Sequence, residues 1–214
     1  MITKALLSTL FCAITFQGFS QYSASSIPDS LKEDAAVVKR LEEVTFHVKD
    51  VDNATLNMHK VFTVMNEKGR SKLFFYLTTS KALKIDEVDI RVYDEDGIPI
   101  AKYKKRDLSK QAYQGGLVVD GMYHWLTIPF NSYPVTVEIN YETVYSNSLN
   151  YPRYDIQEAK ESVESSMFKV IVPFDLDLRY MEQKVHLTPV ISEEGNNKTY
   201  TWRTKGLKAL KRDE

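Results

Sequence analysis

The four histidines are the side chains whose chemistry is most easily tested against spacing. His47 and His59 lie on either side of Asp52 and Asn53, which are residue types that favour turns. A hairpin centred on Asn53 would place the two imidazoles directly opposite each other on its polar face. Two histidines are half of a zinc site, which needs three or four ligands, and no third ligand is spaced near them. We therefore expect a solvated histidine pair and no metal site.

Other catalytic patterns are missing from the sequence. No G-x-S-x-G elbow, P-loop or dinucleotide fingerprint occurs. Adjacent carboxylates such as Glu42–Glu43 and Glu193–Glu194 would point to opposite faces of a strand, so they make no acid–base pair. The stretch Asp94-Glu95-Asp96-Gly97 lacks the spacing and distal Glu of a calcium loop and fits a hairpin turn better. These patterns predict that the chain is not an enzyme and binds no cofactor.

The N-terminus has the three-part pattern of a secretory signal peptide. Lys4 precedes an uncharged run from Ala5 to Phe16, and the small residues Gly18 and Ser20 follow. The run is shorter than the ~20 apolar residues that span a bilayer. We expect cleavage after Ser20 or one residue later. The alternative is an anchor that stays attached.

Removal of the leader would limit which reactive groups remain in the mature chain. Cys12 is the only cysteine and would leave with the leader, which excludes a thiol nucleophile, a cysteine metal site and a disulfide scaffold. The leader holds one basic residue, so 28 basic and 29 acidic residues become 27 and 29, a net charge of −2. This overall balance gives no footprint for nucleic acid or an anionic membrane. No other apolar run is long enough for a transmembrane span. We expect a periplasmic or extracellular protein.

Alternation of apolar and polar residues, broken by turn signals, predicts a chain built mainly of strands. For example, Val44, Phe46 and Val48 share one face of a strand. Gly69 in a second turn suits a positive φ, residues 72–79 are expected to form a buried strand, and Glu194 to Asn197 separates the last two strands. The expected strands are 44–48, 56–65, 72–79, 88–93, 98–103, 117–119, 123–128, 135–144, 168–172, 177–181, 185–191 and 199–203.

The resulting fold class is all-β, as an antiparallel β-sandwich-like module with minor helical content. Two stretches, Asp29 to Glu43 and Ile156 to Ser166, are helical by propensity alone, although propensity is a weak predictor. We expect a signal peptide at 1–20, a lead-in segment at 21–34, the β-sandwich-like domain at 35–203 and a tail or linker at 204–214.

Several turn and strand motifs carry a resemblance to a known family. They are residues 64–69 (VMNEKG), 92–97 (VYDEDG), Asp107-Leu108, Asp120 and 137–142 (VEINYE). From Ala35 to the C-terminus the chain resembles the bacterial secreted domain of unknown function 3857. In that family the domain usually precedes a transglutaminase-like core.

The resemblance implies a β-sandwich-like module. It also implies that Ala35 to Val48 and Glu161 to Val172 are largely extended, against their helix propensity. We follow it for the second stretch and leave the first open before its strand end. A transglutaminase-like core would bring a Cys–His–Asp triad. The chain stops at Glu214, near where that core would begin, so no activity is carried over.

Aromatic residues are the clearest candidates for binding. Tyr145, Tyr151, Arg153 and Tyr154 fall in a polar segment between two predicted strands. Loops normally run over the surface, and interfaces are enriched in Tyr and Arg. The rings are either a docking surface or a cover for the core, and truncation would distinguish the two.

Two functions fit these observations. One is a non-catalytic secreted envelope module that binds or positions a partner, such as a transglutaminase-like domain, an envelope protein or a glycan. The other is the N-terminal accessory part of a larger transglutaminase-like or papain-like enzyme.

Overall fold

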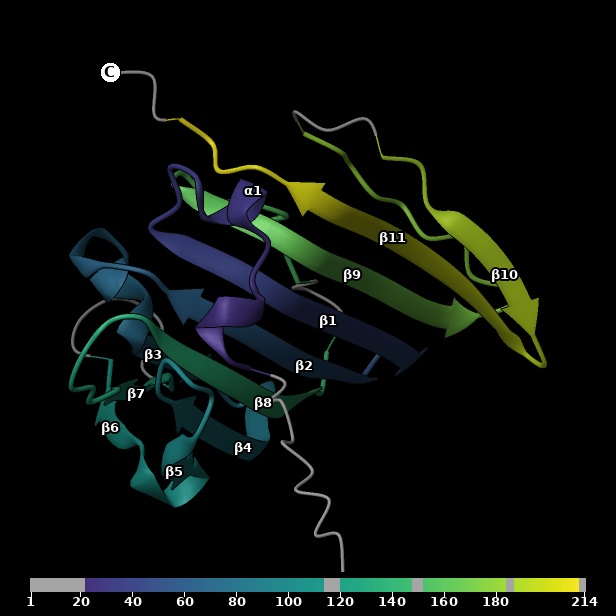
Figure 1. The fold of residues 1–214 in the computed structure, drawn as a ribbon. Coiled ribbons are helices and arrows are strands. Elements are labelled where there is room, and N and C mark those ends of the chain that lie inside the picture. The colour runs from purple at the N-terminus through teal and green to yellow at the C-terminus, as the bar shows by residue number, and fades with distance from the viewer. Residues whose placement is uncertain (1–21, 114–119, 148–151, 184–186, 212–214) are drawn as a thin grey trace, which may run out of the picture.

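A computed structural model describes residues 22–113, 120–147, 152–183 and 187–211. Within these ranges the chain forms an eight-stranded and a three-stranded sheet (Figure 1). The strands are β1 (Val37–Asp50), β2 (Asn53–Val64), β3 (Phe74–Thr79), β4 (Leu83–Tyr93), β5 (Pro99–Lys104), β6 (Ser109–Ala112), β7 (Met122–Thr127), β8 (Val135–Tyr145), β9 (Glu161–Pro173), β10 (Val190–Glu194) and β11 (Asn197–Leu207). The helical pieces are the 3-10 turns η1 (Ala24–Ser26), η2 (Glu67–Leu73) and η3 (Lys105–Asp107) and the helix α1 (Asp29–Lys32).

The large sheet has the order β10-β11-β9-β1-β2-β8-β4-β5, and the small one has the order β3-β7-β6. The predicted mainly-β class is confirmed. All pairings between the named strands are antiparallel except that of β1 with β9, which makes the large sheet mixed. No helix in the described part of the chain is long and apolar enough to cross a membrane.

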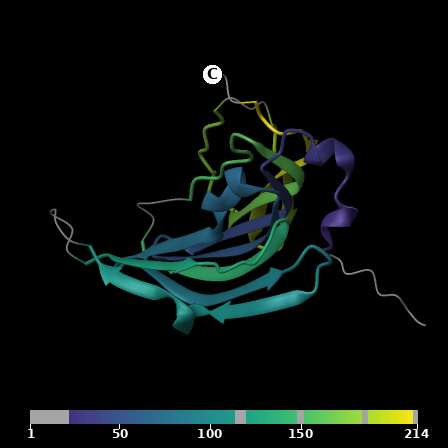
Figure 2. The same ribbon diagram turned by 60° about the vertical axis from the view of Figure 1, so that its left-hand side comes forward.

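The core consists of three clusters, two on one face of the large sheet and the third on the other. In the first, Phe75 and Leu108 from the small-sheet side pack on apolar residues of β2, β4 and β8, so the two sheets form a partial sandwich. The second gathers on β1, β9 and β11 around Val44 and Trp202. On the opposite face the N-terminal segment buries Ile27 against Val38, and Figure 2 shows this purple segment apart from the teal strands.

Two strands replace the segments for which helix propensity is high. Helix in the stretch Asp29 to Glu43, which has high helix propensity, is confined to α1, and β1 begins at Val37. The second stretch enters β9 at Glu161, as the family resemblance implies. Both strands pair on two sides and bury apolar residues such as Val38 and Val163, so tertiary burial overrides propensity.

The β1–β2 hairpin has a different register from the predicted one. Its loop is Val51-Asp52, because Asp50 pairs with Asn53. His47 therefore lies opposite Thr55, and His59 lies opposite Glu43. The predicted histidine pair was wrong, because the centre of the hairpin falls ahead of Asn53.

The predicted buried strand at residues 72–79 was also wrong in its burial and its start. Lys72 and Leu73 belong to η2, and β3 alternates between exposed and covered residues. The small sheet has one face toward the core and one toward solvent, so Phe74 and Tyr76 are exposed while Phe75 between them is buried.

Three of the other predicted strands need comment. Residues 177–181 form no strand, and Leu176 and Leu178 pack against the second cluster. The strand expected at 185–191 begins at Val190, and part of its expected range, 185–186, lies outside the described residues. The strand expected at 117–119 also lies outside them. The turns at Asp94–Gly97 and Glu194–Asn197 are confirmed, and Gly97 has a φ of 78°.

Gly69 is required for close approach rather than for a positive φ. A Cβ at this position would lie 2.5 Å from the carbonyl oxygen of Ala36 and 2.8 Å from Cγ2 of Val37. The φ of Gly69 is not in the left-handed region, so the positive φ predicted for this turn was wrong. The glycine lets η2 lie directly against the start of β1.

At the C-terminus, β11 continues past Arg203 to Leu207. The carbonyl oxygen of Leu210 then accepts a hydrogen bond from the amide of Lys160. The segment expected to be a tail is thus attached to the sheet over these residues.

Candidate functional site

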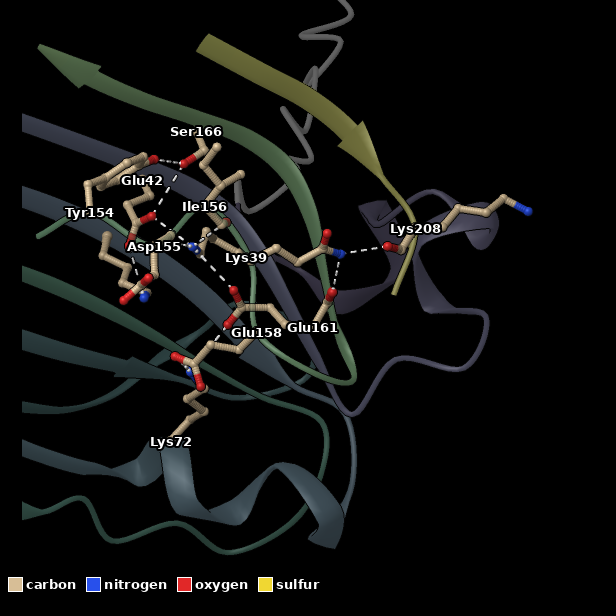
Figure 3. Close-up of polar contacts among 12 residues, drawn as sticks. Lys39, Glu42, Lys72, Tyr154, Asp155, Ile156, Glu158, Glu161, Ser166 and Lys208 are labelled. Atoms are coloured by element: carbon tan, nitrogen blue, oxygen red, sulfur yellow. Dashed lines mark hydrogen bonds and ion pairs between the residues drawn. The ribbon is translucent and has the colours of Figure 1, made fainter. Parts of the chain in front are cut away.

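A buried cluster of charged side chains lies where β1, β9 and η2 meet (Figure 3). Lys39 on β1 is 1% exposed, and its Nζ lies 2.7 Å from Oε2 of Glu42 and 3.2 Å from Oε1 of Glu161. The same ammonium donates a 2.9 Å hydrogen bond to the carbonyl oxygen of Ile156. Glu161 is itself only 2% exposed. A buried lysine and two buried carboxylates thus share one site.

Two further lysines complete the balance of charge. Lys60 Nζ lies 2.9 Å from Oε1 of Glu42. Lys72 of η2 pairs with Glu158 and lies 3.4 Å from Oε2 of Glu161. We call Lys39, Lys60, Lys72, Glu42, Glu158 and Glu161 the charged cluster.

The charged cluster affects the titration of Glu42. Burial raises the pKa of Glu42, but Lys60 and Lys39 outweigh it and hold that pKa below its usual value. A lowered pKa in the folded state adds stability that is complete above the unfolded-state pKa and is lost as the pH falls through the lowered one.

The chemistry open to the charged cluster is structural. Its three lysines and three carboxylates neutralise one another, and Lys39, Glu42 and Glu161 are closed to solvent. It joins β1, β2, β9, η2 and residues 155–158, which are far apart in sequence. We therefore assign it to positioning the fold.

The open face of the large sheet carries a second polar group of residues. His59 Nε2 lies 3.0 Å from Oε1 of Glu138, and the hydroxyl of Tyr93 donates to Oε2 of Glu138 at 2.7 Å. Burial and this bond raise the pKa of Tyr93 to about 12. A groove of about 460 Å³ lies beside His59, lined also by Glu87 and Glu142. Among the described residues, no group of three or more His, Cys, Asp or Glu side chains could hold a metal ion.

The predicted aromatic loop is dispersed in the structure. The ring of Tyr145 meets that of Phe46 edge-on, with ring centres 5.4 Å apart. Tyr154 stacks on Phe168 with ring centres 4.8 Å apart, and its hydroxyl shares a hydrogen bond with Ser166. Burial raises the pKa of both tyrosines. Arg153 is exposed and pairs with Asp155 at 3.0 Å, while Tyr151 lies outside the described residues. The two described rings cover the second core cluster.

The outer side of the small sheet exposes aromatic residues instead. Phe74, Tyr76 and Tyr123 are 50%, 61% and 47% exposed. Tyr76 lies opposite the half-buried Trp125 in the β3–β7 register, and Phe74 stacks near Tyr76 with ring centres 6.3 Å apart. We call Phe74, Tyr76, Tyr123 and Trp125 the aromatic face. The sequence held no local signal for it, because the KLFFYLTT stretch holds a continuous apolar run.

An apolar groove continues from the aromatic face. It has a volume of about 520 Å³ and is lined in part by Phe74, Leu73, Ile128, Pro129 and Phe130, with Arg70 at its border. Phe74 belongs to both features, so the face and the groove form one surface. Flat rings, a hollow and a guanidinium are what protein interfaces use as anchors.

Comparison with known proteins identifies the family. Residues 51–211 match a domain of unknown function with a solved structure, DUF3857, and the chain belongs to this family. No curated protein matches the sequence.

Solved structures with a similar fold are larger proteins. A “putative protease” from Parabacteroides distasonis superposes with a TM-score of 0.68 at 11% identity, over 83% of this chain and 37% of that one. This chain therefore spans well under half of that protein, and the likeness concerns the fold alone. Two further structures are too distant to carry an argument. The M1 zinc metallopeptidase of Deinococcus radiodurans has a TM-score of 0.38 at 9% identity, over 79% of this chain and 39% of that one. Leukotriene A4 hydrolase of Saccharomyces cerevisiae has a TM-score of 0.38 at 14% identity, over 86% of this chain and 32% of that one.

Proposed function

We propose that the chain is a non-catalytic module of the cell envelope that docks and positions a partner domain through its aromatic face. The observation that carries this proposal is the exposure of Phe74, Tyr76 and Tyr123 on one side of a small sheet. Monomeric proteins seldom leave contiguous apolar surface uncovered, and such patches mark interaction sites. The three innermost members of the charged cluster, Lys39, Glu42 and Glu161, are closed to solvent, which also favours a non-catalytic role.

The second candidate function is that of an accessory N-terminal part of a larger transglutaminase-like or papain-like enzyme. It is favoured by the length of the Parabacteroides distasonis protein, of which this fold covers 37%. The two candidates share one partner, because a transglutaminase-like domain could be joined to the chain or separate from it. An in-frame continuation beyond codon 214 that encodes Cys, His and Asp would favour the enzyme part.

Export is part of the proposal. The Lys4, apolar run and Gly18-Phe19-Ser20 pattern supports a mature protein that begins at Gln21 in the periplasm or outside the cell. Intact-mass measurement on protein recovered from the envelope should show loss of residues 1–20. Retention of Met1 to Ser20 would mean that the leader acts as an anchor.

Replacing Tyr76 with alanine is expected to weaken binding of a transglutaminase-like domain from the same genome by roughly 30-fold. Removing a central aromatic anchor costs about 2 kcal/mol or more. Isothermal titration calorimetry with the separately purified domain measures this, and a thermal melt verifies the fold. Phe174→Ala is the matched control, because Phe174 is 52% exposed but lies after β9. Equal affinities for the two variants would remove the aromatic face from the proposal.

A further inference from the structure

The edge strands of the two sheets differ in how they are protected against pairing with another chain. Among the described residues these edges are β10 and β5 of the large sheet and β3 and β6 of the small one. β10 carries Glu193 and Glu194, β5 carries Pro99 and lysines, and β6 carries Lys110. Charges and proline at an edge discourage the addition of a strand. β3 is the exception, because its sequence FFYLTT holds neither and its pairing with β7 is regular.

The hydrogen bonds of the small sheet fix which backbone groups of β3 point outward. The amide of Ile128 donates to the carbonyl oxygen of Leu73 at 2.8 Å, where β3 begins to run beside β7. In an antiparallel pair the bonded positions recur at every second residue. Phase and register therefore turn the backbone groups of Phe75 toward β7, and those of Tyr76 and Thr78 away from it.

Most of these outward groups are unpaired. The amide of Phe74 is used, because it donates to the carbonyl oxygen of Ser71. The carbonyl oxygen of Phe74 and both backbone groups of Tyr76 and Thr78 make no backbone hydrogen bond to any residue that the structure describes. β3 thus presents a row of donors and acceptors directly beside the exposed rings of Phe74 and Tyr76.

We propose that an extended segment of the partner adds to the edge of β3 as a further strand of the small sheet, an inference that rests on the proposed docking function. Backbone donors and acceptors at two-residue spacing are complementary to the backbone of an extended polypeptide. Beside Phe74 and Tyr76 the added strand places aromatic or β-branched side chains, because such cross-strand pairs stabilise a sheet. Since β3 offers no charge, an uncharged segment fits it best. The apolar groove begins at Phe74 and receives a side chain from one end of the segment.

Proline at position 78 tests the edge without changing the aromatic face. Thr78→Pro removes an outward amide and spares the bonds to β7, since proline is tolerated at an edge where the N–H faces solvent. Thr78→Ala is the matched control, because it shortens the side chain but keeps the amide. Binding of a transglutaminase-like domain from the same genome is measured by calorimetry, and thermal melts verify the fold. We expect Thr78→Pro to weaken binding about tenfold or more, and Thr78→Ala by less than about twofold.

Hydrogen exchange in the unsubstituted protein gives a second reading that does not depend on the folding of a variant. In the free protein, NMR should show fast exchange for the amides of Tyr76 and Thr78 and slow exchange for those of Phe75 and Leu77. The strand probe is an acetylated, amidated peptide that alternates Thr with Tyr. We expect this peptide to slow exchange at Tyr76 and Thr78, whereas the same peptide N-methylated at every residue should not. Slow exchange of both amides in the free protein, or equal protection by the two peptides, would overturn the inference.

The two variants separate this inference from the docking function itself. If Tyr76→Ala weakens the domain while Thr78→Pro and Thr78→Ala bind it equally, docking stands and strand addition is refuted. If neither Tyr76→Ala nor Thr78→Pro weakens the domain, the docking function is refuted as well. Protection of Tyr76 and Thr78 by the Thr–Tyr peptide without any binding of the domain would keep the strand site and refute that domain as its partner. Dimers of the mature chain that Thr78→Pro dissociates would place a second copy at the edge and overturn the partner segment.

Discussion

Replacing Lys39 with methionine is expected to lower the free energy of unfolding by about 3–5 kcal/mol, because it leaves buried carboxylates without their cation. Lys39 is the lysine that contacts both Glu42 and Glu161, at 2.7 and 3.2 Å. Methionine is unbranched and replaces the apolar stem of lysine up to Cε, so the loss is mainly that of the ammonium group. Denaturant unfolding at neutral pH, followed by circular dichroism, measures the change.

The matched control for Lys39 is Lys208→Met. Lys208 pairs with Glu33 at 3.1 Å, but both side chains are more than 60% exposed, so its loss should cost at most about 1 kcal/mol. Adding Glu161→Gln to Lys39→Met removes a buried negative charge and should recover part of the stability. If Lys39→Met cost no more than Lys208→Met, the charged cluster would not hold the fold together.

Replacing Tyr154 with alanine is expected to lower the free energy of unfolding by about 2–3 kcal/mol, less than for a fully buried ring. The side chain stacks on Phe168 at 4.8 Å and bonds to Ser166, beside the charged cluster. For a domain of this size the melting temperature should fall by roughly 4–12 °C. Thermal unfolding by calorimetry gives the value.

Arg153→Ala is the control for Tyr154, because Arg153 is 82% exposed and pairs only locally with Asp155. It should leave the melting temperature within about 2 °C. A Tyr154→Ala variant with normal stability but weakened binding of a transglutaminase-like domain would restore the loop from Tyr145 to Tyr154 as the docking surface.

Much of the fold was predictable because period-two patterns are local. Val44, Phe46 and Val48 fix which face of β1 is buried, and all three lie in the second core cluster. The register of the first hairpin was not predictable, because Asp52 and Asn53 both favour turns. A shift in the loop moved His59 from opposite His47 to opposite Glu43.

The charged cluster could not be predicted from alternation. In a regular strand, Lys39 and Glu42 would point to opposite faces because they are three residues apart. The register shifts between Lys39 and Leu41, so a bulge turns both side chains to the same side. Contacts with Glu161 and Ile156 then depend on strand pairing across more than a hundred residues. Such pairing leaves no local signal.

The burial of two candidate binding residues, and the exposure of β3, were missed for a related reason. Aromatic residues between strands suggest an exposed loop, but Tyr145 and Tyr154 turn toward the second core cluster. The FFY sequence in β3 suggests burial, yet β3 belongs to a sheet with only one covered face. Which side of a strand faces solvent depends on the second layer, and the sequence around the strand does not contain that information.

Hydrogen–deuterium exchange with and without a transglutaminase-like domain tests the docking account most directly. If the aromatic face is the docking surface, amides of β3 and of residues 122–130 should exchange more slowly in the complex. Amides of β9 and β11, which lie under the second cluster, should be unchanged. Protection confined to residues 145–155, or no protection of β3 and β7 under conditions in which the domain is bound, would contradict the account.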